Sequence, residues 1–337
     1  MGSEPPPRED PLMEGDEDEE DEDEALFLEE GEALRETVLD ADAAPPPEED
    51  DEEGAGANGD GGGAGAGGSG EASGAAAAPE RDDAAWTAHV PDSVYAVAFH
   101  PSADAIVAGG GDEVGRAWAP DAGTAPVREL GGHTDSITAV GFSADGALLA
   151  TAGCDARALV WDSATGEQKS ALEGPAEGIE WLEWHPRGHV ILAGAEDFTA
   201  WMWNADTGAC MQVFTGHSGS VTCGGFTPDG RTVVTASADG SLRVWDPRTG
   251  ACGASVQGHG FHEGPVNCLA FSPDGATTVT GDENGLVCVT SVGGGRPLQQ
   301  MRAHTDAVVA TGVCPAMPSI CASAGSDGKV VVWDMPS

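Results

Sequence analysis

Short apolar runs separated by turn-forming residues recur along the chain after residue 84. One stretch reads GHTDSITAVGFSADGALLATAGCDARALVWD and ends at Asp162, and another reads GHSGSVTCGGFTPDGRTVVTASADGSLRVWD and ends at Asp246. Asp and Gly between apolar runs are typical of turns that join short strands. Six such units follow one another, and a period of about 40–45 residues predicts an array whose units bury their faces against their neighbours.

A tryptophan marks the end of most units. Trp118, Trp161, Trp203 and Trp245 are separated by 43, 42 and 42 residues, and Trp333 lies 88 residues further on, which is two periods. Repeats of this length that end in Trp-Asp resemble WD40 repeats, and the resemblance implies a four-stranded blade for each repeat. The fold expected for residues 84–337 is therefore an all-β WD40 β-propeller with six readable repeats.

Polar residues recur inside the repeats at matching spacings. A His stands 22 residues before an Asp in two copies and 23 before it in the last, a Ser or Thr stands four before the Asp, and a Trp stands six after it. The resemblance implies that these side chains form a buried hydrogen-bonded chain that rigidifies each blade. A structural role is favoured over catalysis for all of them. The residues are His133, Thr151, Asp155 and Trp161; His217, Thr235, Asp239 and Trp245; and His304, Ser323, Asp327 and Trp333.

The third repeat departs from this pattern. It lacks the Gly-His pair and reads EGIEWLEWHPRGHVILAGAEDFTAWMWN, and other unusual segments are VTCGGFTPDG, GHGFHEGPVNC and VCPAMP. In the fifth repeat, Thr290 and Ser291 replace Trp-Asp. Together these segments resemble the angio-associated migratory cell protein family, whose fungal relative is a dedicated chaperone of a large-subunit ribosomal protein.

The blade count raises a question of ring closure. Members of that family resemble eight-bladed propellers, whereas six repeats are readable here. Either the ring closes with fewer blades, or the chain is a truncated eight-bladed ring that lacks its last two. We favour the second alternative, in which an open end leaves unpaired strand edges and an exposed apolar blade face.

Composition divides the chain near residue 84. Residues 1–83 hold 30 acidic and three basic side chains, with Pro-rich and Gly/Ala-rich stretches, so we expect a disordered acidic tail. Within it, the island Ala25–Leu39 carries apolar residues that suit a short helical face: Leu26, Phe27, Leu34, Val38 and Leu39. Two interpretations stay open for the island: a solvated stretch, or a segment that orders on a partner or on the propeller.

Charge and cysteine usage narrow the classes of partner. Residues 84–337 hold 28 acidic and 11 basic side chains, so both parts of the chain repel nucleic acid and anionic lipid and attract basic polypeptides. The eight cysteines show no paired CxxC spacing, and neither a secretory signal nor an apolar run of about 18 residues is present. We expect a monomer that is cytoplasmic or also nuclear, without cofactor, metal or membrane contact.

Acidic residues recur near the start of each first strand. The repeats align on Val94, Ile137, Ile179, Val221, Val266 and Val308, and in four of them an acid stands two positions earlier. These acids are Asp92, Asp135, Glu177 and Asp306, and Glu263 lies one position before the equivalent Gly264. The turns between second and third strands add Asp112, Glu113, Glu196, Asp197, Asp282 and Glu283. With exposed Trp181 and Trp184 beside them, these acids predict a face that binds a Lys/Arg-rich peptide.

Three non-enzymatic functions remain after the motifs are weighed. GGGDEVG at Gly109–Gly115 falls in a blade turn rather than between a strand and a helix, so a phosphate loop is disfavoured, and we expect no catalytic residue. The favoured function is a binder of a basic ribosomal protein segment that acts as a chaperone in ribosome assembly. The alternatives are a scaffold in signalling or cell migration, and a substrate receptor of a cullin-type ubiquitin ligase. The last rests on Trp245-Asp246-Pro247-Arg248, which matches a Trp-Asp-x-Arg adaptor motif.

Overall fold

The computed structural model describes residues 33–38, 86–119, 121, 123–302 and 304–335. These residues form six four-stranded antiparallel sheets, here called blades 1 to 6 in chain order. Blade 1 contains β2 (Val94–Phe99), β3 (Ile106–Gly110), β4 (Gly115–Trp118) and β5 (Arg128–Leu130). Blade 2 contains β6 (Ile137–Phe142), β7 (Leu148–Gly153), β8 (Ala158–Asp162) and β9 (Gln168–Leu172). Blade 3 contains β10 (Ile179–Trp184), β11 (Val190–Ala195), β12 (Thr199–Asn204) and β13 (Ala209–Thr215).

The other three blades follow the same order. Blade 4 contains β14 (Cys223–Phe226), β15 (Val233–Ala236), β16 (Leu242–Trp245) and β17 (Cys252–Val256). Blade 5 contains β18 (Val266–Phe271), β19 (Thr277–Asp282), β20 (Leu286–Ser291) and β21 (Arg296–Arg302). Blade 6 contains β22 (Val308–Val313), β23 (Ile320–Gly325), β24 (Lys329–Asp334) and β1 (Ala33–Val38). The predicted all-β fold with six repeats is confirmed.

The hydrophobic core is distributed over the seams between blades. One cluster joins Ala150 and Val160 of blade 2 to Ile179, Ile191 and Trp203 of blade 3, and others join blades 4 and 5 and blades 5 and 6. Polar contacts also cross these seams, since the Thr138 hydroxyl donates to the carbonyl oxygen of Ile179 at 2.5 Å. Each blade is therefore stabilised by its neighbours rather than by a core of its own.

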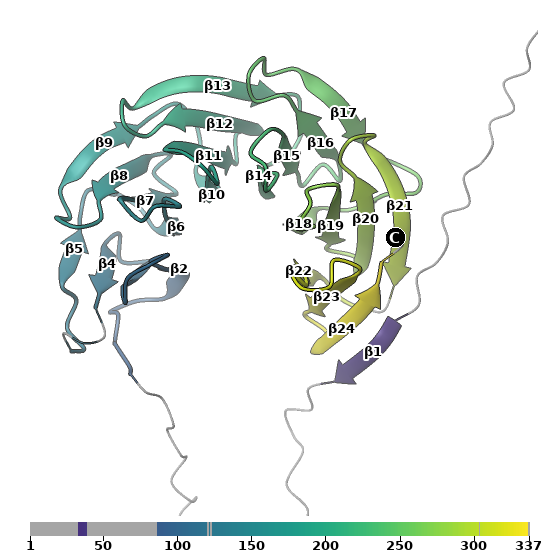
Figure 1. Ribbon diagram of the computed structural model, residues 1–337, viewed down its shortest axis with the longest axis horizontal. Helices are drawn as coiled ribbons and strands as arrows, with labels where there is room; N and C mark the ends of the chain where they lie inside the picture. The colour runs from purple at the N-terminus through teal and green to yellow at the C-terminus, as the bar shows by residue number, and fades with distance from the viewer. Residues whose placement is uncertain (1–32, 39–85, 120, 122, 303, 336–337) are drawn as a thin grey trace, which may run out of the picture.

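The ring that these blades trace is open. Figure 1 shows the six blades along an arc whose first and last sheets, with β2 and β22 innermost, lie apart. Accordingly, Val97 and Phe99 of β2 are 61% and 74% exposed, and Val309 of β22 is 56% exposed. A six-bladed ring closed on itself is therefore wrong, and the expected exposed apolar blade face is present.

The last blade takes its fourth strand from the N-terminal part of the chain. β1 pairs antiparallel with β24, with Ala33 opposite Trp333 and Val38 opposite Lys329. Part of the Ala25–Leu39 island thus orders on the propeller, as one of the two interpretations held, and it forms a strand although its apolar residues suited a short helical face. The rest of the predicted disordered tail lies outside the described residues.

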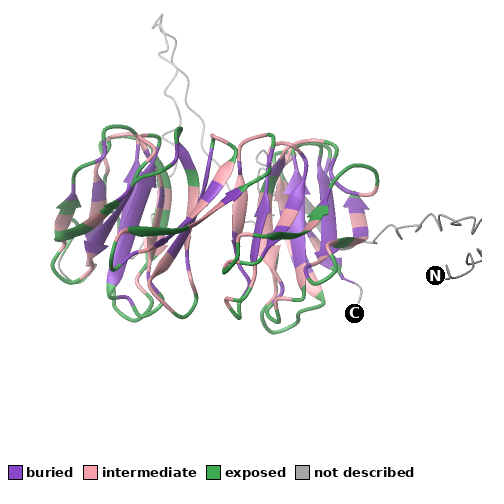
Figure 2. Ribbon diagram, turned by 90° about the horizontal axis from the view of Figure 1, so that it is seen from above, coloured by how far each residue is buried: buried purple, intermediate pink, exposed green. Residues whose placement is uncertain are grey.

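Because neighbouring strands run antiparallel, the connections between strands gather on two opposite faces of the arc. Figure 2 shows strands crossing the disc and exposed loops at both of its faces. One face is formed by the loops that enter each first strand and by the turns between second and third strands, and we call it the loop face. The opposite face is formed by the turns between first and second strands and between third and fourth strands, and we call it the turn face.

Candidate protein-interaction site

Three blades contain the predicted buried polar chain. In blade 2, Trp161 Nε1 donates to Thr151 Oγ1 at 3.1 Å, Thr151 Oγ1 lies 2.8 Å from His133 Nε2, and His133 Nδ1 lies 3.0 Å from Asp155 Oδ2. Blade 4 repeats these contacts through Trp245, Thr235, His217 and Asp239 at 2.8, 2.8 and 3.2 Å. Blade 6 repeats them through Trp333, Ser323, His304 and Asp327 at 2.8, 2.8 and 2.9 Å.

The chain in blade 4 favours a neutral histidine. Burial lowers the pKa of His217, against the opposing charge of Asp239. The Thr235 hydroxyl accepts a hydrogen bond from Trp245, so its own proton is free to point at Nε2 of His217, and the remaining ring proton on Nδ1 faces Asp239. The pKa of Asp239 is lowered to about 2, because hydrogen bonds from Ser241 and Ser218 outweigh the effect of burial. Such a chain holds the loop and the turn together.

Blade 5 contains a variant of this chain that the sequence analysis missed. His262 Nε2 lies 2.7 Å from Thr280 Oγ1, and His262 Nδ1 lies 3.0 Å from Asp282 Oδ2. The His-to-Thr spacing of 18 residues, as between His133 and Thr151, was the signal that identifies it. The Asp, however, follows the Thr by two positions instead of four. Asp282 is therefore buried, and its assignment to the surface acids was wrong.

Blades 1 and 3 lack the histidine and use the turn Asp differently. Asp112 lies 2.5 Å from Arg116, with both side chains largely buried. Asp197 accepts hydrogen bonds from the backbone N–H groups of Ala176 (2.8 Å) and Thr199 (3.1 Å). Asp112 holds its own turn and Asp197 also joins its turn to the loop before β10, so neither carboxylate belongs to the open acidic face. Of the six turn acids, Glu113, Glu196 and Glu283 remain exposed.

The predicted loop acids are all on the surface of the loop face. Asp92, Asp135, Glu177, Glu263 and Asp306 are exposed, one on each of five blades. The three aspartates also accept a hydrogen bond from the next backbone N–H, at 2.7 to 2.8 Å. Their position is thus partly explained by turn formation, which uses one carboxylate oxygen and leaves the charge facing water.

The prediction that Trp181 and Trp184 are exposed on the loop face is wrong. Trp184 is 8% exposed, packs in the core between blades 2 and 3, and donates from Nε1 to the carbonyl oxygen of Gly141 at 2.9 Å. Trp181 is half-buried against the core between blades 3 and 4 and donates to Val221 O at 2.8 Å. Both indoles therefore bridge seams, because a large ring on an innermost strand is covered by the adjacent blade, and neither offers a free face to a peptide.

Several acids lie near one another where blades 2 and 3 meet. Burial and then the negative charge of Glu196 raise the pKa of Glu180. Burial raises the pKa of the Cys154 thiol as well, and the charges of Asp135, Glu196 and Glu180 raise it further. In both groups burial contributes most to the raised pKa, and the neighbouring negative charges add to it. We call Asp135, Glu177, Glu180 and Glu196 the seam acids.

An exposed aromatic ring stands beside the seam acids. Phe198 follows Asp197 in the turn between β11 and β12, is 46% exposed, and has a φ of +70°. The equivalent position is Gly240, Gly285 and Gly328 in blades 4, 5 and 6, with φ between +77° and +81°. A bulky side chain is rare in this left-handed region, and outliers of this kind cluster at functional sites. A bulky residue at the Gly position after the turn Asp was the overlooked sequence signal.

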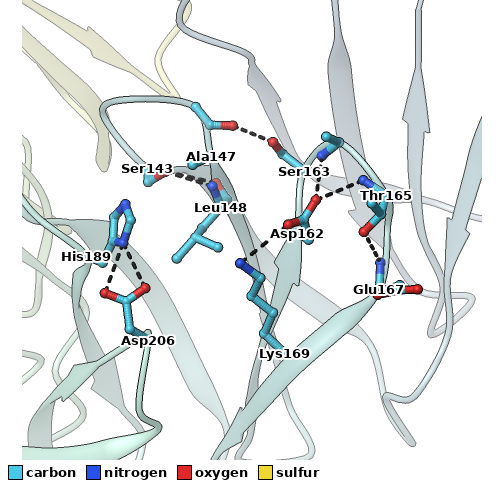
Figure 3. A network of polar contacts seen from close by, with 12 residues as sticks. Ser143, Ala147, Leu148, Asp162, Ser163, Thr165, Glu167, Lys169, His189 and Asp206 are labelled. Atoms are coloured by element: carbon cyan, nitrogen blue, oxygen red, sulfur yellow. Dashed lines mark hydrogen bonds and ion pairs between the residues drawn. The ribbon is translucent and has the colours of Figure 1, made fainter.

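The turn face carries a different charged cluster. His189 Nδ1 lies 2.9 Å from Asp206 of the same blade, and His189 Nε2 lies 3.0 Å from Asp145 of blade 2. Partial burial acts to lower the pKa of His189, but the two carboxylates outweigh it and the pKa is raised. Figure 3 shows His189 pointing at Asp206, beside the Ser143–Leu148 turn and the Asp162–Lys169 pair. We call His189 with Asp145 and Asp206 the His189 clamp. It borders a cavity of about 490 Å³ that Arg187 also lines.

Other kinds of site are not found among the residues described. No group of three or more His, Cys, Asp or Glu side chains there is arranged to hold a metal ion. No helix within the described ranges is long and apolar enough to cross a bilayer.

Comparison with known families agrees with the architecture. The family model described as WD domain, G-beta repeat matches residues 83–118, 124–162, 166–204, 208–246, 250–291 and 295–334, which together make up more than two thirds of the chain. Each match after the first includes the outer strand of one blade and three strands of the next. The sixth match ends with the third strand of blade 6, and β1 supplies the fourth strand of that blade.

Two curated relatives match shorter stretches. Angio-associated migratory cell protein from Homo sapiens is 39% identical over 103 residues, which cover 30% of this chain and 23% of the relative. Ribosome assembly protein SQT1 from Saccharomyces cerevisiae is 30% identical over 104 residues, which cover 28% of this chain and 23% of the relative. The matched stretches thus span less than a quarter of each relative's length.

Among solved structures, the computationally designed Ika8 protein is similar over most of the arc. It superposes with a TM-score of 0.64 at 27% identity, and the match covers 72% of this chain and 71% of the designed chain.

Proposed function

Because this chain belongs to the WD40 repeat family and is a protein-interaction module, we propose that its loop face binds a basic polypeptide. The likeness to a ribosome assembly protein favours a Lys/Arg-rich segment of a ribosomal protein as that polypeptide, and a chaperone role in ribosome assembly. We place this binding in the cytoplasm, with the nucleus as the alternative. A role in binding rather than catalysis fits the buried polar chains, which are used up in holding loops to turns.

The observation that carries the proposal is the uncompensated negative charge at the seam of blades 2 and 3. Burial and then the negative charge of Glu196 raise the pKa of Glu180, and an approaching guanidinium or ammonium group would stabilise its ionised form. Phe198 supplies a ring face for the same cation or its aliphatic stem. Asp92, Glu263 and Asp306 extend the negative face around the arc and attract a longer cationic segment.

Charge reversal on the loop face tests the proposal. The triple variant Asp135→Lys, Glu177→Lys, Asp306→Lys should abolish binding of a Lys/Arg-rich peptide, measured by fluorescence anisotropy, and leave thermal stability nearly unchanged. Wild-type affinity should fall as salt is raised, because exposed charges are screened. A matched control, Asp104→Lys, Glu167→Lys, Asp334→Lys, makes the same change in net charge on the turn face, where these side chains are exposed. Equal affinity of both triple variants, or affinity independent of salt, would contradict the proposal.

Phe198→Gly separates binding from stability. Glycine adopts the positive φ without strain, so stability should stay level or rise by about 1 kcal/mol. Loss of the ring should weaken peptide binding several-fold. Ala156→Gly, at the equivalent position of blade 2 with a φ of +62°, serves as the control and should leave affinity unchanged.

A further inference from the structure

The turn face carries a row of arginines on an otherwise acidic molecule. Arg187, Arg231, Arg248 and Arg296 lie on the turns and strand ends of blades 3, 4, 4 and 5, and all four are exposed. We call them the arginine row. The chain has only 14 Lys and Arg residues against 58 acids, and these four cations lie on neighbouring blades beside the exposed turn aspartates Asp206, Asp229, Asp246 and Asp274.

Two of these arginines line a groove. A cavity of about 660 Å³ lies between the turns of blade 4 and the Val292–Gly293 turn of blade 5, with Arg231 and Arg248 on its wall. Arg296 begins β21 directly after that turn. The groove therefore continues the arginine row toward blade 6.

The nearby carboxylates are largely engaged by the backbone of their own turns. Asp229 Oδ1 accepts from Thr227 Oγ1 at 2.7 Å and from the N–H of Arg231 at 3.0 Å, and Asp246 Oδ1 accepts from the N–H of Arg248 at 2.8 Å. The guanidinium of Arg231 reaches Asp229 only at 3.7 Å, with its side chain 81% exposed. Within the described ranges, no carboxylate lies at ion-pair distance from Arg187, Arg248 or Arg296. The arginine row thus keeps its hydrogen-bond donors for another anion.

The pairing of β1 fixes which end of the acidic tail emerges on this face. Ala33 lies opposite Trp333, and β24 ends at Asp334 on the turn face, whereas Val38 lies opposite Lys329 at the loop face. The residues before Ala33 therefore leave blade 6 on the face that carries the arginine row. They include Glu14–Glu24, in which ten of eleven residues are acidic.

We propose that the acidic run Glu14–Glu24 docks in the same molecule along the arginine row, with Arg231 and Arg248 as its main contacts. Nine positions separate Glu24 from Ala33 and nineteen separate Glu14 from it, so the run extends at most about 30 to 65 Å from Ala33, which brings blades 5 and 4 within range. Single exposed ion pairs are weak, but a tethered segment has an effective concentration in the millimolar range. The docked run covers Arg248, and a partner that recognises the Trp245–Arg248 motif has to displace it.

Proteolysis of the full chain with a Glu-specific protease tests this docking. At low salt, cleavage inside Glu14–Glu24, followed by mass spectrometry, should be about tenfold slower than in the variant Arg231→Ala, Arg248→Ala, as expected when a tethered site is lost. High salt or an excess of free poly-glutamate should bring wild type to the rate of the variant. The control Arg157→Ala, Arg302→Ala removes two loop-face cations and should retain the protection.

Each alternative has its own signature. Equal cleavage rates in wild type and in the groove variant would overturn the proposal. Protection that grows with protein concentration would also overturn it, because the run would then occupy a second copy. Binding of free poly-glutamate to the groove without protection of Glu14–Glu24 would leave an anion-binding groove for another protein and contradict docking of this run. Melting temperatures of all variants exclude unfolding as the cause of faster cleavage.

Discussion

One side chain ties two neighbouring blades together through a pair of carboxylates. On the turn face, His189 has a carboxylate on each ring nitrogen, one from its own blade and one from blade 2. A neutral imidazole carries only one proton, so one of its nitrogens would face Asp145 or Asp206 as an acceptor facing an acceptor. The geometry thus favours the imidazolium form, and the clamp weakens when His189 loses its proton.

The clamp predicts a pH-dependent contribution to stability. The folded-state pKa of His189 is raised above the ordinary value of about 6.5. Its contribution is therefore complete below that pH and is lost as pH rises through the folded-state pKa. The difference in free energy of unfolding between wild type and His189→Gln should be largest near pH 6 and shrink toward pH 9. Urea denaturation at several pH values measures this difference. A difference independent of pH would contradict a charged His189 held between Asp145 and Asp206.

The stability of a blade depends on how many groups of its buried polar chain are hydrogen-bonded. Of the four blades whose chain contains a histidine, blade 5 has the least complete chain. Thr290 stands where Trp161, Trp245 and Trp333 stand in blades 2, 4 and 6, and its buried hydroxyl has no partner. Thr280 meanwhile lies 2.7 Å from His262 and donates to the carbonyl oxygen of Cys288. Two threonines of one hairpin thus differ in whether their hydroxyl groups are bonded.

Replacing these two threonines by valine should have opposite effects. Thr290→Val removes an unpaired buried hydroxyl at nearly constant shape and should raise the free energy of unfolding by about 1 kcal/mol. Thr280→Val leaves the buried Nε2 of His262 without a partner and should lower it by about 1–3 kcal/mol. Chemical denaturation of the two variants against wild type gives both values. A loss of stability in Thr290→Val would indicate a partner for that hydroxyl, such as a buried water.

The sequence predicted whatever follows from the repeat and little of what depends on exceptions to it. The matching spacings, together with the resemblance to WD40 repeats, located the chains of His133, His217 and His304, because a fixed period places equivalent residues at equivalent sites. Trp181 and Trp184 were misassigned because a strand residue faces either solvent or the next blade, and composition does not distinguish the two. Asp282 was misassigned because a two-residue shift moves a carboxylate from the turn into the core. The strand conformation of β1 was not predicted because its partner strand is distant in the sequence.

At the scale of the whole molecule, the arc ends in an uncovered apolar sheet. Tyr95, Val97 and Phe99 of β2 are at least 60% exposed, although every other first strand packs against the blade before it. A contiguous exposed apolar surface of this kind favours self-association.

Polar substitution of that surface should improve solution behaviour without a loss of stability. Val97→Ser, Phe99→Ser should bind less of an apolar dye and aggregate at higher protein concentration than wild type, because these side chains are already exposed to water. Thermal stability should change little. The contrasting variant Val107→Ser, in the core between blades 1 and 2, should be strongly destabilised, since Val107 is fully buried. Unchanged dye binding in the double variant would mean that another surface is responsible.

The pairing of β1 with β24 also imposes a schedule on biosynthesis. Ala33 and Trp333 are 300 positions apart, so at roughly 5–20 residues per second the strand that leaves the ribosome first waits about 15–60 s for its partner. During that delay its unpaired backbone N–H and C=O groups can pair with neighbouring nascent chains. Glu29, Glu30, Glu32, Asp40 and Asp42 flank it on both sides. Charges in such positions act against aggregation, so we expect the flanking acids to keep the strand available until β24 has been synthesised.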